Sequence, residues 1–169
     1  VDVHDGQRHQ RSEGLAVASF DAFLAGRFSS DARDPCRVDA QALAGIDAAA
    51  LAAVFQVSDH NPLVGLDGRA ALLRRLADAL GAPTARPGRL FDELPDELSA
   101  APVSASAILG RLLADYSAIW PSGQWLQGQP LGDVWPHPQA GGDGWVPFHK
   151  LSQWLSYSLL EPFEWAGVA

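Results

Sequence analysis

The chain has 169 residues, of which 47% are hydrophobic and 19% are charged. This length suits one domain with a buried core, and this balance argues against wholesale disorder. The formal net charge is −8, and the sequence has one lysine and no basic block. Nucleic acid and anionic membranes are therefore not expected partners, since both are bound through many cationic contacts.

In the first part of the chain, the spacing of apolar residues predicts one helix between two polar segments. Residues 1–11 show no period, so we expect a frayed end. The helix is predicted to begin at Ser12, a favoured N-cap, and to stop at Gly26. A loop over residues 28–39 contains Cys36, the single cysteine of the sequence, which excludes an intrachain disulfide and a multi-cysteine zinc site.

The middle of the chain carries two predicted helices. Asp47 is the expected N-cap of the first helix, which ends before a turn over residues 58–62 that contains a proline. The second helix has a stripe of four leucines over residues 70–80 and stops at the following glycine. Residues 81–102 are rich in proline and predict a surface connection with one helical turn over residues 90–94.

In the last part, a helix is predicted over residues 104–120 and a second one over residues 147–160, ending before Pro162. Between them, residues 121–146 are rich in glycine, proline and tryptophan. We expect this stretch to be irregular, with a short hairpin over residues 124–131.

These elements predict a mainly α fold, with one helical domain over residues 1–169. No run alternates well enough to require a sheet. The sequence has no methionine and its last residues are apolar, so we expect a piece of a longer protein. No apolar run approaches the ~18 residues that span a bilayer, and no secretory signal is visible, so we expect a cytoplasmic protein.

The residues best suited to chemistry lie near the C-terminus. All six tryptophans fall between residues 120 and 165. Core filling accounts well for Trp120 and Trp154. The tryptophans in loop-like sequence suit a ligand pocket as well as a core, and they are Trp125, Trp135 and Trp145.

A first cluster contains Asp133, Trp135 and His137, in a segment whose glycine and prolines fix the backbone. In an extended segment, side chains at this spacing share one side. Aspartate and histidine together can act as base and orienting group, or as metal ligands. Two ligands are too few to indicate a metal, and a capping aspartate with a packed histidine is the plain alternative.

A second cluster lies on the last predicted helix. His149, Gln153 and Tyr157 follow one another at i, i+4 spacing and would share a face that can hydrogen-bond uncharged polar ligands. Lys150 suits a phosphate at the helix start, or else is a solvated surface lysine. A weaker cluster surrounds Asn61, which is ordinarily a turn-former. No phosphate-binding loop, dinucleotide fingerprint or zinc helix occurs, so neither a cofactor nor a metal is predicted.

Several strings give the chain a resemblance to a uracil-catabolism family of bacteria and fungi, a domain of unknown function in the URC/urg pathway. They cover residues 11–20, 55–57, 61–65, 130–135 and 146–155. Members of that family are much longer than this chain. The resemblance implies hydrolysis of an N-glycosidic bond that releases urea from a ribosyl-urea or its phosphate.

A more distant resemblance is to queuosine-salvage nucleosidases, whose fold is like that of helical DNA glycosylases. Residues 132–135 and 148–153 occupy places similar to two strings of that family. The resemblance implies a helix-hairpin-helix-like bundle. Phe148 stands where that family has an aspartate, so the chemistry here would need another carboxylate.

Two functional hypotheses follow. The first is an N-ribosyl hydrolase with a small ribosyl substrate, whose oxocarbenium-like transition state needs a carboxylate and a proton-transfer group. Asp133 is the predicted carboxylate, and His149 or His137 the proton-transfer group. The predicted substrate-binding residues are Lys150, Gln153, Tyr157, Trp135 and Asn61.

The second hypothesis is a non-catalytic helical scaffold or partner-binding protein of the same pathway. It predicts an exposed apolar patch instead of a polar pocket. The residues expected at such an interface are Phe163, Trp165 and Val168.

Overall fold

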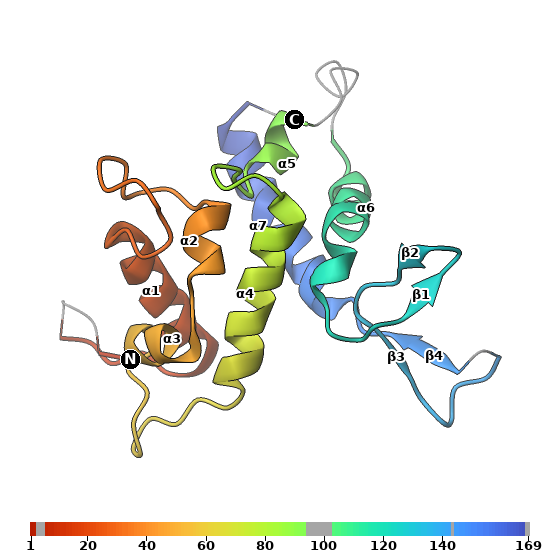
Figure 1. The fold of residues 1–169 in the computed structure, drawn as a ribbon, viewed down its shortest axis with the longest axis horizontal. Coiled ribbons are helices and arrows are strands. Elements are labelled where there is room, and N and C mark those ends of the chain that lie inside the picture. Colours follow the sequence, from red (N-terminus) through yellow and green to blue (C-terminus); the bar gives the residue numbers. More distant parts are fainter. Residues whose placement is uncertain (3–5, 94–102, 143, 168–169) are drawn as a thin grey trace. The chain divides into compact units, whose positions relative to one another are not determined.

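The computed structural model describes residues 1–2, 6–93, 103–142 and 144–167. Residue contacts divide the chain into two compact units, Val1–Pro87 and Gly88–Ala169, called here the N-terminal unit and the C-terminal unit. Figure 1 shows the helices and strands of each. The expectation of one domain over the whole chain stays a prediction.

The N-terminal unit is helical. Its helices are α1 (Arg11–Leu24), α2 (Ala40–Ala44), α3 (Ala48–Val54) and α4 (Leu66–Leu80). Helix α4 packs against α2 and α3, and α1 contacts α3. The buried apolar side chains of these helices are alanines and leucines. Short side chains at a helix contact let the two axes approach closely.

Three of these helices confirm the predicted ones, with small shifts at their ends. Helix α1 begins one residue before Ser12, and Gly26 follows its end with a φ of 71°. Asp47 caps α3 as predicted, its Oδ1 accepting a hydrogen bond from the Ala50 N–H at 2.7 Å. Helix α4 ends at Leu80 and is followed by the C-cap residue Gly81, whose φ of 82° is easily adopted only by glycine.

Helix α2 is not among the predicted elements, because five residues show no readable period. Tertiary contacts stabilise it instead. Its first two N–H groups, from Ala40 and Gln41, donate to the carbonyls of Ala85 and Pro83 at 3.0 and 2.9 Å. Asp39 provides partners for the next two N–H groups, so the whole first turn is satisfied.

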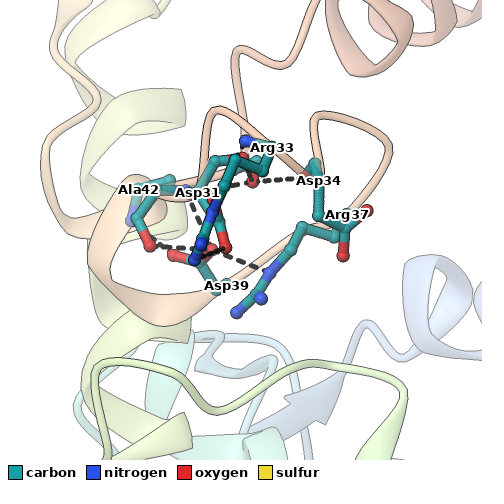
Figure 2. Close-up of polar contacts among 8 residues, drawn as sticks. Asp31, Arg33, Asp34, Arg37, Asp39 and Ala42 are labelled. Atoms are coloured by element: carbon teal, nitrogen blue, oxygen red, sulfur yellow. Dashed lines mark hydrogen bonds and ion pairs between the residues drawn. The ribbon is translucent and has the colours of Figure 1, made fainter.

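Asp39 is the N-cap of α2, with an exposed fraction of 0%. One carboxylate oxygen accepts from the Ala42 N–H at 3.0 Å, and the other from the N–H and hydroxyl of Ser30 at 2.9 and 3.0 Å. Arg37 Nε lies 3.2 Å from Asp39 Oδ2 (Figure 2). Burial raises the pKa of Asp39, but these donors and the arginine charge outweigh burial and hold the pKa below its usual 3.8.

The C-terminal unit combines helices with short strands. Its elements are α5 (Arg89–Asp92), α6 (Ala105–Tyr116), η2 (Ser117–Ile119), β1 (Trp125–Leu126), β2 (Gln129–Pro130), β3 (Val134–Pro136), β4 (Trp145–Pro147) and α7 (Lys150–Trp165). The predicted single helical turn near residue 90 corresponds to α5. None of the helices formed by the described residues, in either unit, is long and apolar enough to cross a membrane.

Helices α6 and α7 pack against each other in this unit. Ile108 and Leu112 of α6 are buried, as are Ser152 and Ser156 of α7. The two serines lie one helical turn apart, and their short side chains allow a close helix contact. The Ser156 hydroxyl donates to the Gln153 carbonyl at 2.7 Å, so its burial does not leave an unpaired donor.

Two antiparallel two-stranded sheets occupy the segment between α6 and α7. Strands β1 and β2 form the hairpin predicted over residues 124–131. Both turn residues, Gln127 and Gly128, have positive φ angles of 51° and 78°, as type I′ hairpin turns require. Strands β3 and β4 lie side by side (Figure 1), and Val134 pairs with Pro147 and Pro136 with Trp145.

The prediction of a mainly α fold with a DNA-glycosylase-like bundle is therefore wrong. About half of the described residues are helical, and the stretch over residues 121–146, expected to be largely irregular, contains strands of both sheets. Strands of two or three residues are too short for alternation between polar and apolar residues to be read. Hydrogen bonding between segments distant in sequence decides their conformation instead.

The boundaries of the last helix also differ from the prediction. Helix α7 covers Lys150–Trp165, whereas the sequence predicted residues 147–160. Pro147 is the last residue of β4 and not the first turn of the helix. Pro162 lies inside α7, where its missing N–H removes one hydrogen bond close to the helix end.

Candidate functional site

Asp133 lies in the tight connection between β2 and β3. Gly132, which precedes it, has a φ of 70°, and a Cβ atom there would lie 2.9 Å from the Ser117 hydroxyl oxygen. The Ser122 hydroxyl donates to the Gly132 carbonyl, and the Val134 N–H donates to the same carbonyl at 2.9 Å. These contacts fix the backbone on both sides of Asp133.

The Asp133 carboxylate is buried and oriented. Asp133 is 8% exposed, and Trp135 Nε1 donates a hydrogen bond to Asp133 Oδ1 at 2.6 Å. Trp135 itself is 37% exposed, so the indole bridges the carboxylate and the surface. The second oxygen, Oδ2, has no hydrogen-bond partner among the described residues, and it is therefore available to a ligand.

Strand pairing brings the start of α7 to Asp133. The Phe148 N–H donates to the Asp133 carbonyl at 2.7 Å, which continues the β3–β4 pairing past Pro147. His149 follows directly as the N-cap residue of α7. Its Nε2 atom is buried and has no hydrogen-bond partner among the residues that the structure describes. A buried nitrogen of this kind calls for a partner such as a water molecule or a ligand atom.

His137 lies at the far end of the β3–β4 hairpin. Its N–H donates to the Gly144 carbonyl at 2.6 Å, and its Nδ1 accepts from the Gln139 N–H at 3.2 Å. A strand rises about 3.3 Å per residue, so the four steps from Asp133 to His137 separate their Cα atoms by roughly 13 Å. The structure therefore brings together Asp133, Trp135 and the backbone of His149, and it leaves His137 apart.

The remaining predicted side chains of α7 lie on its exposed surface. Lys150 and Gln153 are exposed, and Tyr157 is 61% exposed with its ring 6.5 Å from that of Trp154, edge to face. Ser152 and Ser156 of the same helix are buried. The i, i+4 face of Gln153 and Tyr157 is thus accessible to a ligand.

Asn61 belongs to the N-terminal unit, where its side chain holds the backbone. Its Nδ2 donates to the carbonyls of Phe55 and Gln56 at 3.0 and 2.9 Å. The amide closes the loop after α3, as expected for a turn-former. The same residue lines an open groove of about 830 Å³ in that unit.

This groove is the feature that sequence reasoning missed. Residues from segments 1–2, 8–15 and 55–63 line it, and nothing local in these segments indicates that they meet. A second missed feature is the Tyr116 hydroxyl, which is buried without a hydrogen-bond partner among the described residues. Burial raises the pKa of Tyr116, so the phenol stays neutral at physiological pH. The helical period of residues 104–120 carries no signal for this hydroxyl.

The geometry around Asp133 supports chemistry by a carboxylate. An ionised carboxylate next to a partly exposed indole can stabilise a developing cation on a small ligand. Neither Asp133 nor any other acidic side chain joins a group of three potential metal ligands within the described part of the chain. The residues that would surround a ligand here are therefore aromatic and hydrogen-bonding side chains.

A family model described as "Protein of unknown function (DUF1688)" matches residues 2–169. The chain belongs to this family. The resemblance read from the five strings of the sequence is thereby confirmed. No solved structure is significantly similar to this fold.

Two curated fungal proteins are similar to this DUF1688 chain. "Uracil catabolism protein 4" of Lachancea kluyveri is 39% identical over 173 residues, which cover 91% of this chain and 39% of that protein. "Protein urg3" of Schizosaccharomyces pombe is 41% identical over 163 residues, which cover 95% of this chain and 40% of that protein. The chain thus spans about two-fifths of the length of these relatives.

Proposed function

We propose that this DUF1688 chain takes part in cytoplasmic uracil catabolism and hydrolyses the N-glycosidic bond of a ribosyl-urea or its phosphate. The relative named Uracil catabolism protein 4 supports the pathway. The observation that carries the proposed chemistry is the Asp133 carboxylate, which is buried and oriented by Trp135 with one oxygen unoccupied. Such a carboxylate is the group that an oxocarbenium-like transition state requires.

In the proposed reaction, a water oxygen attacks the anomeric carbon while the bond from that carbon to the urea nitrogen breaks. Positive charge develops on the sugar ring, and the free Asp133 oxygen lowers the energy of that charge. The leaving nitrogen takes up one proton and the attacking water loses one, so ribose and urea are the products. His149 is the proposed proton-transfer group, because its Nε2 has no partner among the described residues and its backbone follows the Asp133 contact.

Exposed side chains of α7 are proposed to hold the substrate. Gln153 can bind the urea amide or a sugar hydroxyl, and Tyr157 can do the same through its phenol. Lys150 is placed at the start of α7, where it can bind a phosphate on the sugar. His137 is separated from Asp133 along the hairpin, so we propose no step through it.

The decisive experiment measures urea release from ribosyl-urea and from its 5-phosphate by the 169-residue chain. Replacing Asp133 by asparagine keeps the shape and the indole contact but removes the charge. We expect the rate to fall by about 10³-fold or more, which is typical of losing an essential charged catalytic group. Circular dichroism and tryptophan emission should stay at wild-type values.

The control is Asp92→Asn. Asp92 is an exposed aspartate of the same unit, and its replacement should leave the rate unchanged. Wild-type chain that releases no urea from either substrate contradicts the proposed activity. Equal turnover by the Asp133 and Asp92 variants contradicts the assignment of the carboxylate.

The second candidate is a scaffold or partner-binding protein, and the surface of α7 favours it. Large apolar side chains of this helix that are at least about half exposed are Leu151, Trp154, Leu155, Tyr157 and Trp165. Contiguous exposed apolar surface of this kind is typical of interaction sites. Of the interface residues predicted from the sequence, Trp165 is 76% exposed, Phe163 is buried against Phe91, and Val168 lies outside the described residues.

The two candidates are separated by replacing Leu151 and Trp154 with serine. A hydrolase should keep its rate on a saturating substrate, because neither exposed side chain is among the groups proposed to bind the substrate or to transfer a proton. A partner-binding protein should lose its association with another protein of the pathway, measured by co-purification from a strain that expresses both. Unchanged urea release together with unchanged association would favour the hydrolase alone.

A further inference from the structure

The N-terminal unit carries an open groove of about 830 Å³, lined by residues from segments 1–2, 8–15 and 55–63. It is separate from the Asp133 site, which lies in the C-terminal unit. The basic and hydroxyl side chains that line it are Arg8, His9, Arg11, Ser12, Ser58 and His60. Asp2 is the carboxylate among the described lining residues, and Arg8 Nε donates to its Oδ1 at 2.8 Å.

Side-chain amides fix the two walls of the groove to each other. Gln56 Oε1 accepts from the Asp2 N–H, and Gln56 Nε2 donates to the Asp2 carbonyl, both at 2.8 Å. Asn61 Nδ2 in turn donates to the Phe55 and Gln56 carbonyls. Five hydrogen bonds, counting that of Arg8, therefore keep the groove in one shape before any ligand arrives.

Two lining residues have a backbone conformation that glycine adopts at little cost. Arg11 has a φ of 54° and Gln56 a φ of 53°. For a residue with a Cβ atom this left-handed conformation is unfavourable, so its presence calls for a role of the side chain. The Asp2 contacts explain Gln56. Arg11 has no hydrogen-bond or ion-pair partner among the described residues, so its guanidinium makes no polar contact with them that stabilises the fold.

We infer that this groove binds a small phosphomonoester, with the Arg11 guanidinium as the principal contact. The guanidinium of arginine presents a planar fork that matches phosphate oxygens. The Asp2 charge is already compensated by Arg8, so it does not repel an anion strongly. His60 and the serine hydroxyls supply further donors. A volume of about 830 Å³ exceeds that of inorganic phosphate and suits a sugar phosphate.

The test is isothermal titration calorimetry of the full 169-residue chain with ribose 5-phosphate, with inorganic phosphate and with ribose. We expect heat of binding for ribose 5-phosphate, weaker binding for phosphate and none for ribose. The Arg11→Gln variant should bind ribose 5-phosphate about tenfold more weakly or not at all, as expected for losing one charged contact. Binding should also weaken as the salt concentration rises.

Two further variants make the result specific. Arg86→Gln removes an exposed arginine of the same unit that does not line the groove, and it should bind like wild type. Arg11→Gly relieves the unfavourable backbone conformation, so its melting temperature should equal or exceed that of wild type while binding is lost. A lower melting temperature in Arg11→Gly would show that Arg11 serves the fold, and it would overturn the inference.

The inference also fails if ribose 5-phosphate does not bind, or if it binds Arg11→Gln as tightly as wild type. A loss of binding in Lys150→Gln, together with full binding in Arg11→Gln, would place the phosphate on α7 of the other unit and overturn it. None of these readouts uses urea release, so failure of the groove and failure of the proposed hydrolase are distinguishable.

Discussion

The two units of the chain offer different side-chain chemistry. The N-terminal unit holds nine of the twelve basic side chains against eleven acidic ones, and the C-terminal unit holds three against nine. All six tryptophans belong to the C-terminal unit. The net charge of −8 for the whole chain therefore hides a difference between the units. The N-terminal unit contains a groove with two arginines, and the C-terminal unit is rich in exposed aromatic residues. Net charge is a guide to function only after it has been resolved by unit.

The units also differ in how they are stabilised. In the N-terminal unit, the buried Asp39 carboxylate ties residues 28–39 to the start of α2 (Figure 2). In the C-terminal unit, the α6–α7 contact and the tight turn at Gly132 position the backbone that leads into Asp133. Tryptophan emission reports on the C-terminal unit alone, whereas far-ultraviolet circular dichroism reports on both. Comparing the two signals therefore tests each unit separately.

The largest effect is expected from Asp39→Asn. The amide cannot accept from all the donors around the carboxylate, and it lacks the charge, so we expect the free energy of unfolding to fall by about 2 kcal/mol. Urea unfolding followed by circular dichroism should show this fall in free energy. The unfolding midpoint measured by tryptophan emission should shift less. Equal shifts in both signals would mean that the two units unfold together.

The same substitution changes the dependence of stability on pH. The folded pKa of Asp39 lies below its unfolded value near 3.8, so its contribution is present above that pH and is lost as the pH falls through the folded pKa. The asparagine variant lacks this contribution throughout, so its stability should fall less steeply below pH 4. Parallel curves of unfolding free energy against pH for the wild type and the asparagine variant would contradict the lowered pKa of Asp39.

A smaller effect is expected from Gly132→Ala in the C-terminal unit. Alanine at a φ of 70° is unfavourable, and its Cβ would lie 2.9 Å from the Ser117 hydroxyl oxygen. We therefore expect the free energy of unfolding to fall by about 1–2 kcal/mol. Tryptophan emission should report the shift more strongly than circular dichroism. Combining it with Ser117→Gly removes the contact but keeps the backbone cost. Recovery of part of the stability would confirm the close approach.

The smallest effect is expected from replacing Trp154 alone by serine. The side chain is 61% exposed, and its ring contacts the equally exposed Tyr157, so the free energy of unfolding should change by about 0.5 kcal/mol or less. Chemical unfolding measured by circular dichroism checks this. A loss as large as that of Asp39→Asn would show that the α7 surface is part of a core.

Part of the candidate site could be read from the sequence. The Asp133–Trp135 spacing placed both residues in one extended segment, and the structure joins them by a hydrogen bond. The same reasoning placed His137 with them, because alternation along a strand gives the side of a residue but not its distance. The groove lined by segments 1–2, 8–15 and 55–63 carried no local signal, because its walls meet through Gln56 and Asp2, which are 54 residues apart in the sequence.

The sequence by itself determined the long helices, the position of the first hairpin and membership of the DUF1688 family, because period, caps and local strings are properties of neighbouring residues. Tertiary structure decided the elements that are too short to show a period: helix α2, strands β3 and β4, and the start of α7 at Lys150. Each depends on hydrogen-bond partners from distant segments, such as Ala85 for α2 and the Asp133 carbonyl for Phe148. A short element has too few internal bonds to offset its own ordering, so its conformation is set by what it packs against.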